Sequence, residues 1–270
     1  MERMRSTPAA SVSHGVNPTL VFVHGVLLDR RMWAPLVAEI GPGFRCECPD
    51  LPGHGGSPPP VDDSTGYSVD TLTESITKPI ERVGSPVDFV GFSLGGFIGL
   101  RIAISRPELL RTLILIASSA DVEPPAAVRR YRGLLRLASV PVFGAKLANR
   151  LLIPELMDRS FIKNHPDLAR AIQQGLDANP RSVVRPATEA VLMRAPVLGQ
   201  IGRISMPTLC IAGEHDHIRP VADLEEIATR IPGATLEIIS GARHLVPYTH
   251  AEAVAVTIRQ FLNRVAGPAS

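Results

Sequence analysis

The sequence of 270 residues has little net charge, few cysteines and no long apolar run. Its 28 Lys and Arg nearly balance its 26 Asp and Glu, so the composition gives no sign of a nucleic-acid or membrane-surface partner. Three cysteines, an odd number, argue against a disulfide framework and favour a reducing compartment. No apolar run is long enough to span a bilayer, and residues 1–17 are polar, without the apolar core of a signal peptide. We therefore expect a cytoplasmic globular protein without nucleic-acid or membrane partners, and of unknown oligomeric state.

Short apolar or β-branched runs alternate with segments of helical periodicity over most of the chain. The first run, residues 19–23, precedes apolar residues at helical spacing over residues 32–40. Further strands are expected at residues 44–48, 87–92, 112–117, 208–212 and 235–239, and further helices at residues 72–83, 94–102, 221–231 and 251–265. This alternation predicts an α/β fold with a mostly parallel central sheet flanked by helices.

Residues 121–200 interrupt the alternation with helical patches at 128–138, 144–152 and 168–176 and no convincing strand. We interpret this interval as a helical lid inserted into a core domain of residues 1–120 and 201–270. It carries twelve Lys or Arg against seven Asp or Glu. Two interpretations of that charge remain open: a cationic inner edge that attracts an anionic substrate, or a solvated outer face above an apolar pocket.

The strongest local signal is the G-x-S-x-G motif of residues 91–95, between a predicted strand and a predicted helix. Glycines two residues before and after Ser93 remove the side chains that would collide across so sharp a turn. The turn raises the hydroxyl at the N-terminus of a helix, where developing negative charge is favoured. A bare motif of this kind also fits a Gly-rich turn that packs closely or binds a phosphate, but the flanking elements favour a nucleophile.

A serine nucleophile needs a base, and His244 follows the strand of residues 235–239, so it emerges at the same sheet edge as Ser93. Asp216, after the strand of residues 208–212, is the expected acid that orients the imidazole. Asp121, after the strand of residues 112–117, is the second candidate for that acid. A metal site built from His215, Asp216 and His217 is disfavoured, because adjacent residues rarely converge on one ion.

Four blocks of the sequence resemble the α/β-hydrolase superfamily, in its branch of small esterases, lactonases, carbon–carbon bond hydrolases and cofactor-free haloperoxidases. The blocks are residues 24–26 (HGV), 50–57 (DLPGHGGS), 91–96 (GFSLGG), and 213–216 (GEHD) with 241–244 (GARH). The resemblance implies that the backbone N–H groups of Val26 and Leu94 form an oxyanion hole, and it implies no cofactor and no metal. His24 and His54 are then structural, and residues 50–57 organise the loop beneath the site. One departure is the short chain before Thr19, which suggests a missing or irregular first edge strand.

Haloalkane dehalogenases and epoxide hydrolases of this fold carry an aspartate at the position of Ser93. The dehalogenases also carry a tryptophan at the position of Leu94. The resemblance therefore implies acyl transfer: Ser93 attacks a carbonyl, His244 protonates the leaving group and water hydrolyses the acyl-enzyme. Small-molecule esters and lactones are the first expectation, then thioesters, then carbon–carbon cleavage. A perhydrolase or haloperoxidase-like activity and a catalytically silent ligand receptor remain as alternatives.

Overall fold

The structure, a computed structural model, describes residues 18–60, 67–84 and 86–267. Within them the central sheet has six strands in the order β2-β1-β3-β4-β5-β6, and every neighbouring pair is parallel. The strands are β1 (Thr19–Val23), β2 (Arg45–Glu47), β3 (Val87–Phe92), β4 (Leu110–Ile116), β5 (Thr208–Gly213) and β6 (Thr235–Ile239). The predicted parallel α/β fold is confirmed, although β2 is shorter than predicted and β4 begins earlier, at Leu110. The expectation about the first edge strand concerns residues 1–17, which lie outside the described residues.

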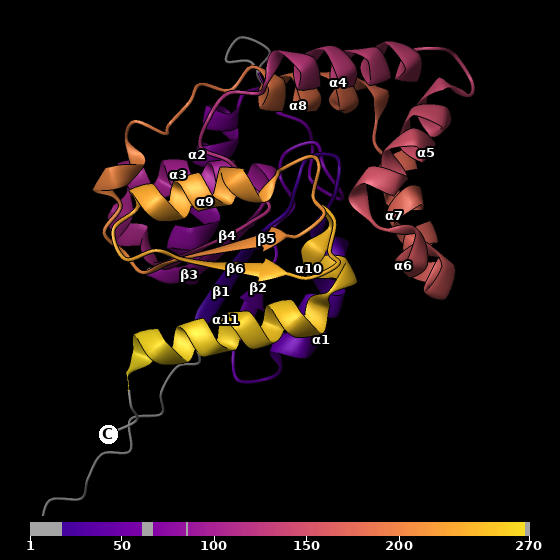
Figure 1. The fold of residues 1–270 in the computed structure, drawn as a ribbon. Helices are drawn as coiled ribbons and strands as arrows, with labels where there is room; N and C mark the ends of the chain where they lie inside the picture. The colour runs from indigo at the N-terminus through magenta and orange to yellow at the C-terminus, as the bar shows by residue number, and fades with distance from the viewer. Residues whose placement is uncertain (1–17, 61–66, 85, 268–270) are drawn as a thin grey trace, which may run out of the picture.

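Helices cover both faces of the sheet (Figure 1). One face carries α2 (Val69–Val83), α3 (Leu94–Ser105) and α9 (Val221–Arg230), and the other carries α1 (Ala34–Ile40), α10 (Val246–Thr249) and α11 (Ala251–Ala266). Successive strand residues point to opposite faces. Phe22 and Phe92 therefore pack with the residues of α1 and α11, whereas Val23 and Phe89 pack with those of α2, α3 and α9.

Helix α3 lies at the centre of the molecule. Every residue from Leu94 to Ala103 is buried, as expected for a helix that is apolar on nearly all sides. Its charged residue, Arg101, donates from Nε to Asp70 Oδ1 at 2.7 Å. It follows β3, which is hydrogen-bonded between β1 and β4. The Ser93 turn between β3 and α3 is thereby fixed in the middle of the carboxyl edge of the sheet.

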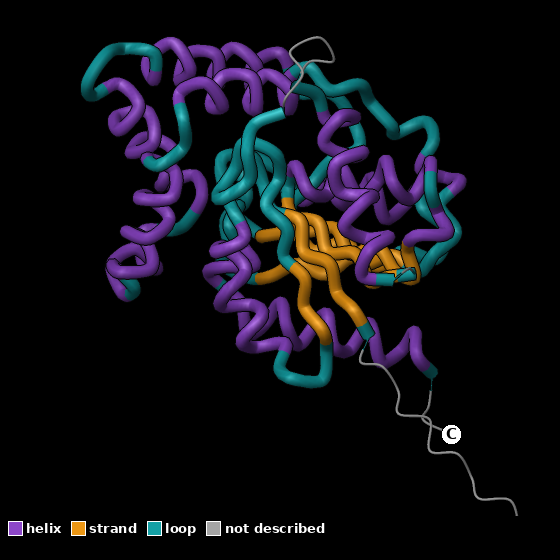
Figure 2. The backbone as a smooth tube through the Cα atoms, turned by 180° about the vertical axis from the view of Figure 1, so that it is seen from behind, coloured by secondary structure: helices purple, strands orange, loops and turns teal. Residues whose placement is uncertain are grey.

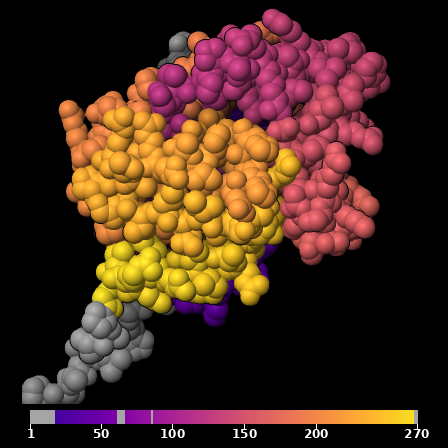
Figure 3. All heavy atoms as spheres, viewed as in Figure 1, coloured from indigo at the N-terminus to yellow at the C-terminus, as the bar shows by residue number. Residues whose placement is uncertain are grey.

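Five α-helices and one short 3-10 helix (Ile201–Arg203) connect β4 to β5, and we call the five α-helices the α4–α8 segment. They are α4 (Pro125–Ala138), α5 (Gly144–Leu156), α6 (Arg159–Asn164), α7 (Pro166–Asp177) and α8 (Arg181–Leu192). Helices α4 and α8 lie side by side, and α5, α6 and α7 continue down beyond the carboxyl ends of the strands (Figures 1 and 2). In the space-filling view the segment borders the core along its upper and right-hand edges (Figure 3). Residues 121–200 are all described, and they contain helices but no strand.

None of the helices in the described part of the chain combines the length and apolar character needed to cross a bilayer.

Candidate active site

The sharp turn predicted at Ser93 is present, and its backbone is strained. Ser93 has a φ of 51° and a ψ of −110°, a conformation that costs a residue with a side chain about 1–3 kcal/mol. A Cβ on Gly91 would lie 2.4 Å from Gly95 O, and a Cβ on Gly95 would lie 1.9 Å from Val23 O. The backbone crossing therefore requires glycine at both positions. Ser93 N donates to Ile116 O at 2.9 Å, which fixes the turn to β4.

His244 and Asp216 form a buried pair on the loops that follow β6 and β5. His244 Nδ1 lies 2.7 Å from Asp216 Oδ2, and each residue is only 4% exposed. The other carboxylate oxygen, Oδ1, accepts backbone N–H bonds from Ile218 at 2.8 Å and Arg219 at 2.9 Å. With an ionised carboxylate as acceptor, Nδ1 carries the proton and Nε2 remains able to accept one.

The His24-Gly25 turn at the end of β1 lies directly beside Ser93. A Cβ on Gly25 would lie 2.8 Å from the Phe92 ring and 3.4 Å from Ser93 Cβ, so only glycine lets the turn approach this closely. Val26 follows in the cavity wall. Leu94 is the first residue of α3, and its N–H therefore has no acceptor within the helix. Both predicted oxyanion donors lie on the turns that flank Ser93.

Ser93, His244 and Val26 line one cavity between the sheet edge and the α4–α8 segment. Most of its wall is apolar and comes from that segment. Every helix of the segment except α6 contributes leucines to the cavity wall: Leu134, Leu135, Leu152, Leu156, Leu176 and Leu192. Such a cavity suits a ligand with an apolar body and a polar group at the Ser93 end.

The alternative acid, Asp121, lies elsewhere. It is exposed, and its Oδ1 accepts from the N–H of the next residue, Val122, at 2.8 Å, whereas Asp216 contacts His244. Within the described residues, no group of three or more His, Cys, Asp or Glu side chains is arranged to hold a metal ion. Glu214 connects the two loops of the pair, because its Oε2 accepts from Ser240 Oγ at 2.7 Å and from Gly241 N at 2.8 Å.

The other two histidines of the motif blocks, His24 and His54, are buried. His54 Nδ1 lies 3.0 Å from Pro52 O, whereas its Nε2 has no hydrogen-bond partner among the described residues. His24 Nε2 accepts from Leu51 N at 2.9 Å, so its Nδ1 carries the proton and donates to Gly25 O at 2.8 Å. Burial, with a contribution from His54, lowers the pKa of His24 to about 4. Burial also lowers the pKa of His54. Both rings are therefore neutral near pH 7.

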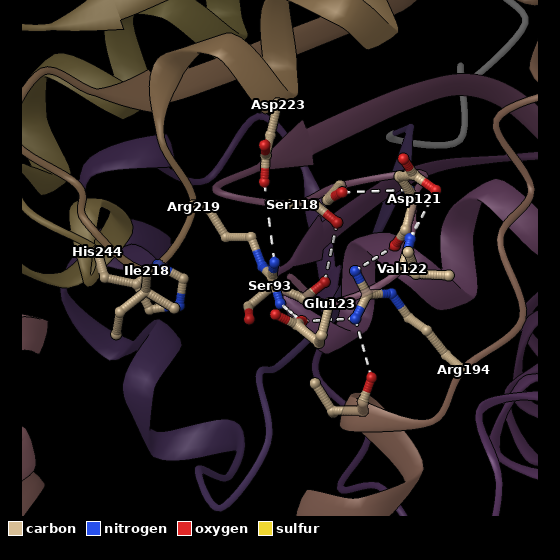
Figure 4. Close-up of polar contacts among 12 residues, drawn as sticks. Ser93, Ser118, Asp121, Val122, Glu123, Arg194, Ile218, Arg219, Asp223 and His244 are labelled. Carbon is tan, nitrogen blue, oxygen red and sulfur yellow. Dashed lines mark hydrogen bonds and ion pairs between the residues drawn. The ribbon is translucent and has the colours of Figure 1, made fainter. Parts of the chain in front are cut away.

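Sequence reasoning missed a buried ion-pair cluster of Glu123, Arg194 and Arg219, of which Glu123 and Arg219 line the cavity (Figure 4). The partners are 71 and 96 residues apart in the chain, so no local pattern pairs them. The single available sign was an acidic residue at the start of the predicted insertion, before its first helical patch at residues 128–138.

The central sheet is parallel, a strained serine lies at its central strand-to-helix turn, and a His–Asp pair lies at the same edge. These features define the class of α/β-fold serine hydrolases. The family model described as the alpha/beta hydrolase fold matches residues 18–251. The chain belongs to the α/β-hydrolase family, as its motifs suggested.

The chain is similar to named esterases and lactonases over nearly its full length. It is 30% identical to a pimeloyl-[acyl-carrier protein] methyl ester esterase of Xanthomonas campestris, covering 93% of this chain and 96% of that protein. It is 27% identical to 3-oxoadipate enol-lactonase 2 of Acinetobacter baylyi, covering 93% and 92%. A thermophilic esterase from Thermogutta terrifontis superimposes with a TM-score of 0.83 at 26% identity, over 98% and 99% of the two chains. The expected class, an ester or lactone hydrolase, is confirmed.

Proposed function

We propose that the protein hydrolyses a small carboxylic ester or lactone through an acyl-enzyme on Ser93, with His244 as general base and Asp216 as the residue that orients it. The observation that carries the proposal is the 2.7 Å contact between His244 Nδ1 and Asp216 Oδ2. This contact does not use Nε2, and His244 lines the same cavity as Ser93. His244 takes the Ser93 proton as the hydroxyl attacks the carbonyl, and then returns it to the leaving alcohol. A water activated by the same imidazole hydrolyses the acyl-enzyme.

The oxyanion of the tetrahedral intermediate is bound by the N–H groups of Val26 and Leu94. Donors fixed in advance at a developing oxyanion contribute about 3 kcal/mol each to transition-state stabilisation. The positions of both residues beside Ser93 support this assignment.

The α4–α8 segment serves as the lid in this proposal and supplies the acyl pocket. Its leucines line the cavity, and several of its arginines are paired with acids of the same segment, as in Arg130–Glu155 and Arg132–Glu189. This arrangement favours the apolar-pocket interpretation over a cationic inner edge. We therefore propose a substrate with an apolar acyl group.

The proposal includes a cytoplasmic location, which the three free thiols of Cys46, Cys48 and Cys210 support.

The test is a series of p-nitrophenyl esters from acetate to hexanoate. We expect kcat/KM to rise by up to about fourfold per methylene, because each buried methylene contributes about 0.8 kcal/mol. Leu152→Ala, in the cavity wall, reduces this gain, whereas its exposed neighbour in α5, Leu151→Ala, leaves it unchanged. Ser93→Ala abolishes turnover of every ester. Turnover that survives Ser93→Ala would overturn the mechanism, and equal effects of the two leucine variants would overturn the pocket.

A further inference from the structure

Glu123 joins three parts of the molecule that are far apart in the chain (Figure 4). It lies between β4 and α4, at the start of the α4–α8 segment, whereas Arg194 follows α8 at the end of that segment and Arg219 follows the Asp216 turn. Arg194 Nη1 donates to Glu123 Oε1 at 2.5 Å, and Arg219 Nη2 donates to the same oxygen. The three side chains are at most 4% exposed. Both ends of the segment and the loop of the proposed catalytic acid therefore meet at one carboxylate.

The cluster also contacts the helix that begins after Ser93. The guanidinium carbons of Arg194 and Arg219 lie 4.0 Å and 5.1 Å from the centre of the Phe97 ring, one turn into α3. Arg194 Nη2 donates in addition to Asp121 O, across the junction between β4 and the segment. Cation–π contacts and shared ion pairs fix the planes of both guanidinium groups.

Both arginines remain cationic at neutral pH although burial lowers the pKa of each to about 10. Two buried cations need a compensating charge, because an unpaired buried charge is strongly destabilising. Glu123 supplies it inside the cluster, and Asp223 Oδ2 lies farther away, 3.8 Å from Arg219 Nη1. The position of the Arg219 side chain thus depends on Glu123.

Arg219 is also a direct partner of the acid. Its backbone N–H donates to Asp216 Oδ1, while Asp216 Oδ2 contacts His244 Nδ1. A shift of Arg219 therefore changes how the carboxylate is presented to the imidazole. Removal of the hydrogen-bond partners that orient metal-ligating side chains typically costs about 10–100-fold in activity, and we take this as the scale of the effect here.

We propose that Glu123 is a positioning residue. It holds Arg219 in place when both ends of the α4–α8 segment are packed on the core, and Arg219 in turn orients Asp216 and His244. This inference rests on the proposed function of Ser93, His244 and Asp216. If Glu123 acts in this way, kcat depends on how the α4–α8 segment is attached to the core, and the effect is not limited to ester binding.

The test compares Glu123→Gln with Glu189→Gln. Glu189 is a matched control in the same segment: its Oε2 pairs with Arg132 Nη2 at 2.9 Å between α8 and α4, away from Arg219. Steady-state kinetics with p-nitrophenyl acetate are normalised to active sites titrated with a small fluorophosphonate. We expect Glu123→Gln to lower kcat by about tenfold or more with KM within threefold, in line with the loss of an orienting group. Glu189→Gln should keep both constants within twofold of the parent values.

A second variant, Glu123→Asp, keeps the compensating charge but draws the carboxylate back by one methylene, so it remains informative if Glu123→Gln does not fold. It should also lower kcat per titrated site. The inference is overturned if a folded Glu123 variant keeps the kcat of Glu189→Gln, or if only KM or the melting temperature changes. An active Ser93→Ala would instead overturn the proposed function, whatever the Glu123 variants do.

Discussion

Replacing Asp216 by Asn tests how the acid orients the imidazole. Asp216 Oδ1 accepts two backbone N–H bonds, from Ile218 and Arg219, so an Asn oxygen must stay on that side and its NH₂ group must face His244 Nδ1. The imidazole then has to accept at Nδ1 and carries its proton on Nε2, where it cannot take one from Ser93. We expect kcat to fall by about 10⁴-fold, which corresponds to about 5.5 kcal/mol in activation free energy.

The assay is ester hydrolysis by purified Asp216→Asn at neutral pH, with circular dichroism to show that it is folded. Asp121→Asn is the control, because that exposed carboxylate contacts the N–H of its own neighbour and should leave kcat within about twofold, as for most surface substitutions. A loss of less than tenfold for Asp216→Asn, or a larger loss for Asp121→Asn, would refute the assignment of the acid.

Three further outcomes follow from the structure. Gly95→Ala should prevent folding in a solubility and thermal-melt assay, because its Cβ would overlap Val23 O, whereas Gly133→Ala, with open space in α4, should stabilise by about 0.5–1 kcal/mol. Burial lowers the pKa of His24 to about 4 in the folded protein, whereas in the unfolded chain it is 6.5. Between these two pH values the unfolded chain therefore binds one proton more than the folded protein. Stability in urea titrations should be complete above about pH 6.5 and fall by about 3 kcal/mol toward pH 4, a slope that His24→Gln reduces. Finally, an acidic and a neutral ester of similar size should show the same response of kcat/KM to ionic strength. A fall in kcat/KM with rising ionic strength for the acidic ester alone would instead favour the interpretation of a cationic inner edge on the lid.

The fold was predictable where a segment carries its own periodicity. β3 and the buried α3 follow from mostly apolar runs, in which Asp88 and Arg101 are the charged residues, and the Ser93 turn follows from its glycines. The prediction ended α5 at Leu152, but the helix continues past Pro154 to Leu156, and α8 was not predicted as a helix at all. Pro186 lies inside α8, and proline inside a helical pattern argues for a helix end. Tertiary packing overrode that local signal.

The candidate site was predictable where topology alone determines position. Residues that follow β3, β5 and β6 must reach the same carboxyl edge, so Ser93, Asp216 and His244 could be brought together from the alternation of strands and helices. The Glu123 cluster could not, because it depends on how the α4–α8 segment is seated on the core. Glu123 is 71 positions from Arg194 and 96 positions from Arg219, and hydrogen bonds over such separations produce no periodic pattern in the sequence.

The most direct test of the central claim is covalent labelling by a fluorophosphonate, followed by mass spectrometry of the modified peptide. A serine activated by His244 should react faster than every other hydroxyl, so the account predicts one adduct, on Ser93, formed much more slowly in His244→Ala. An adduct on a different residue, or an undiminished rate in His244→Ala, would contradict the account.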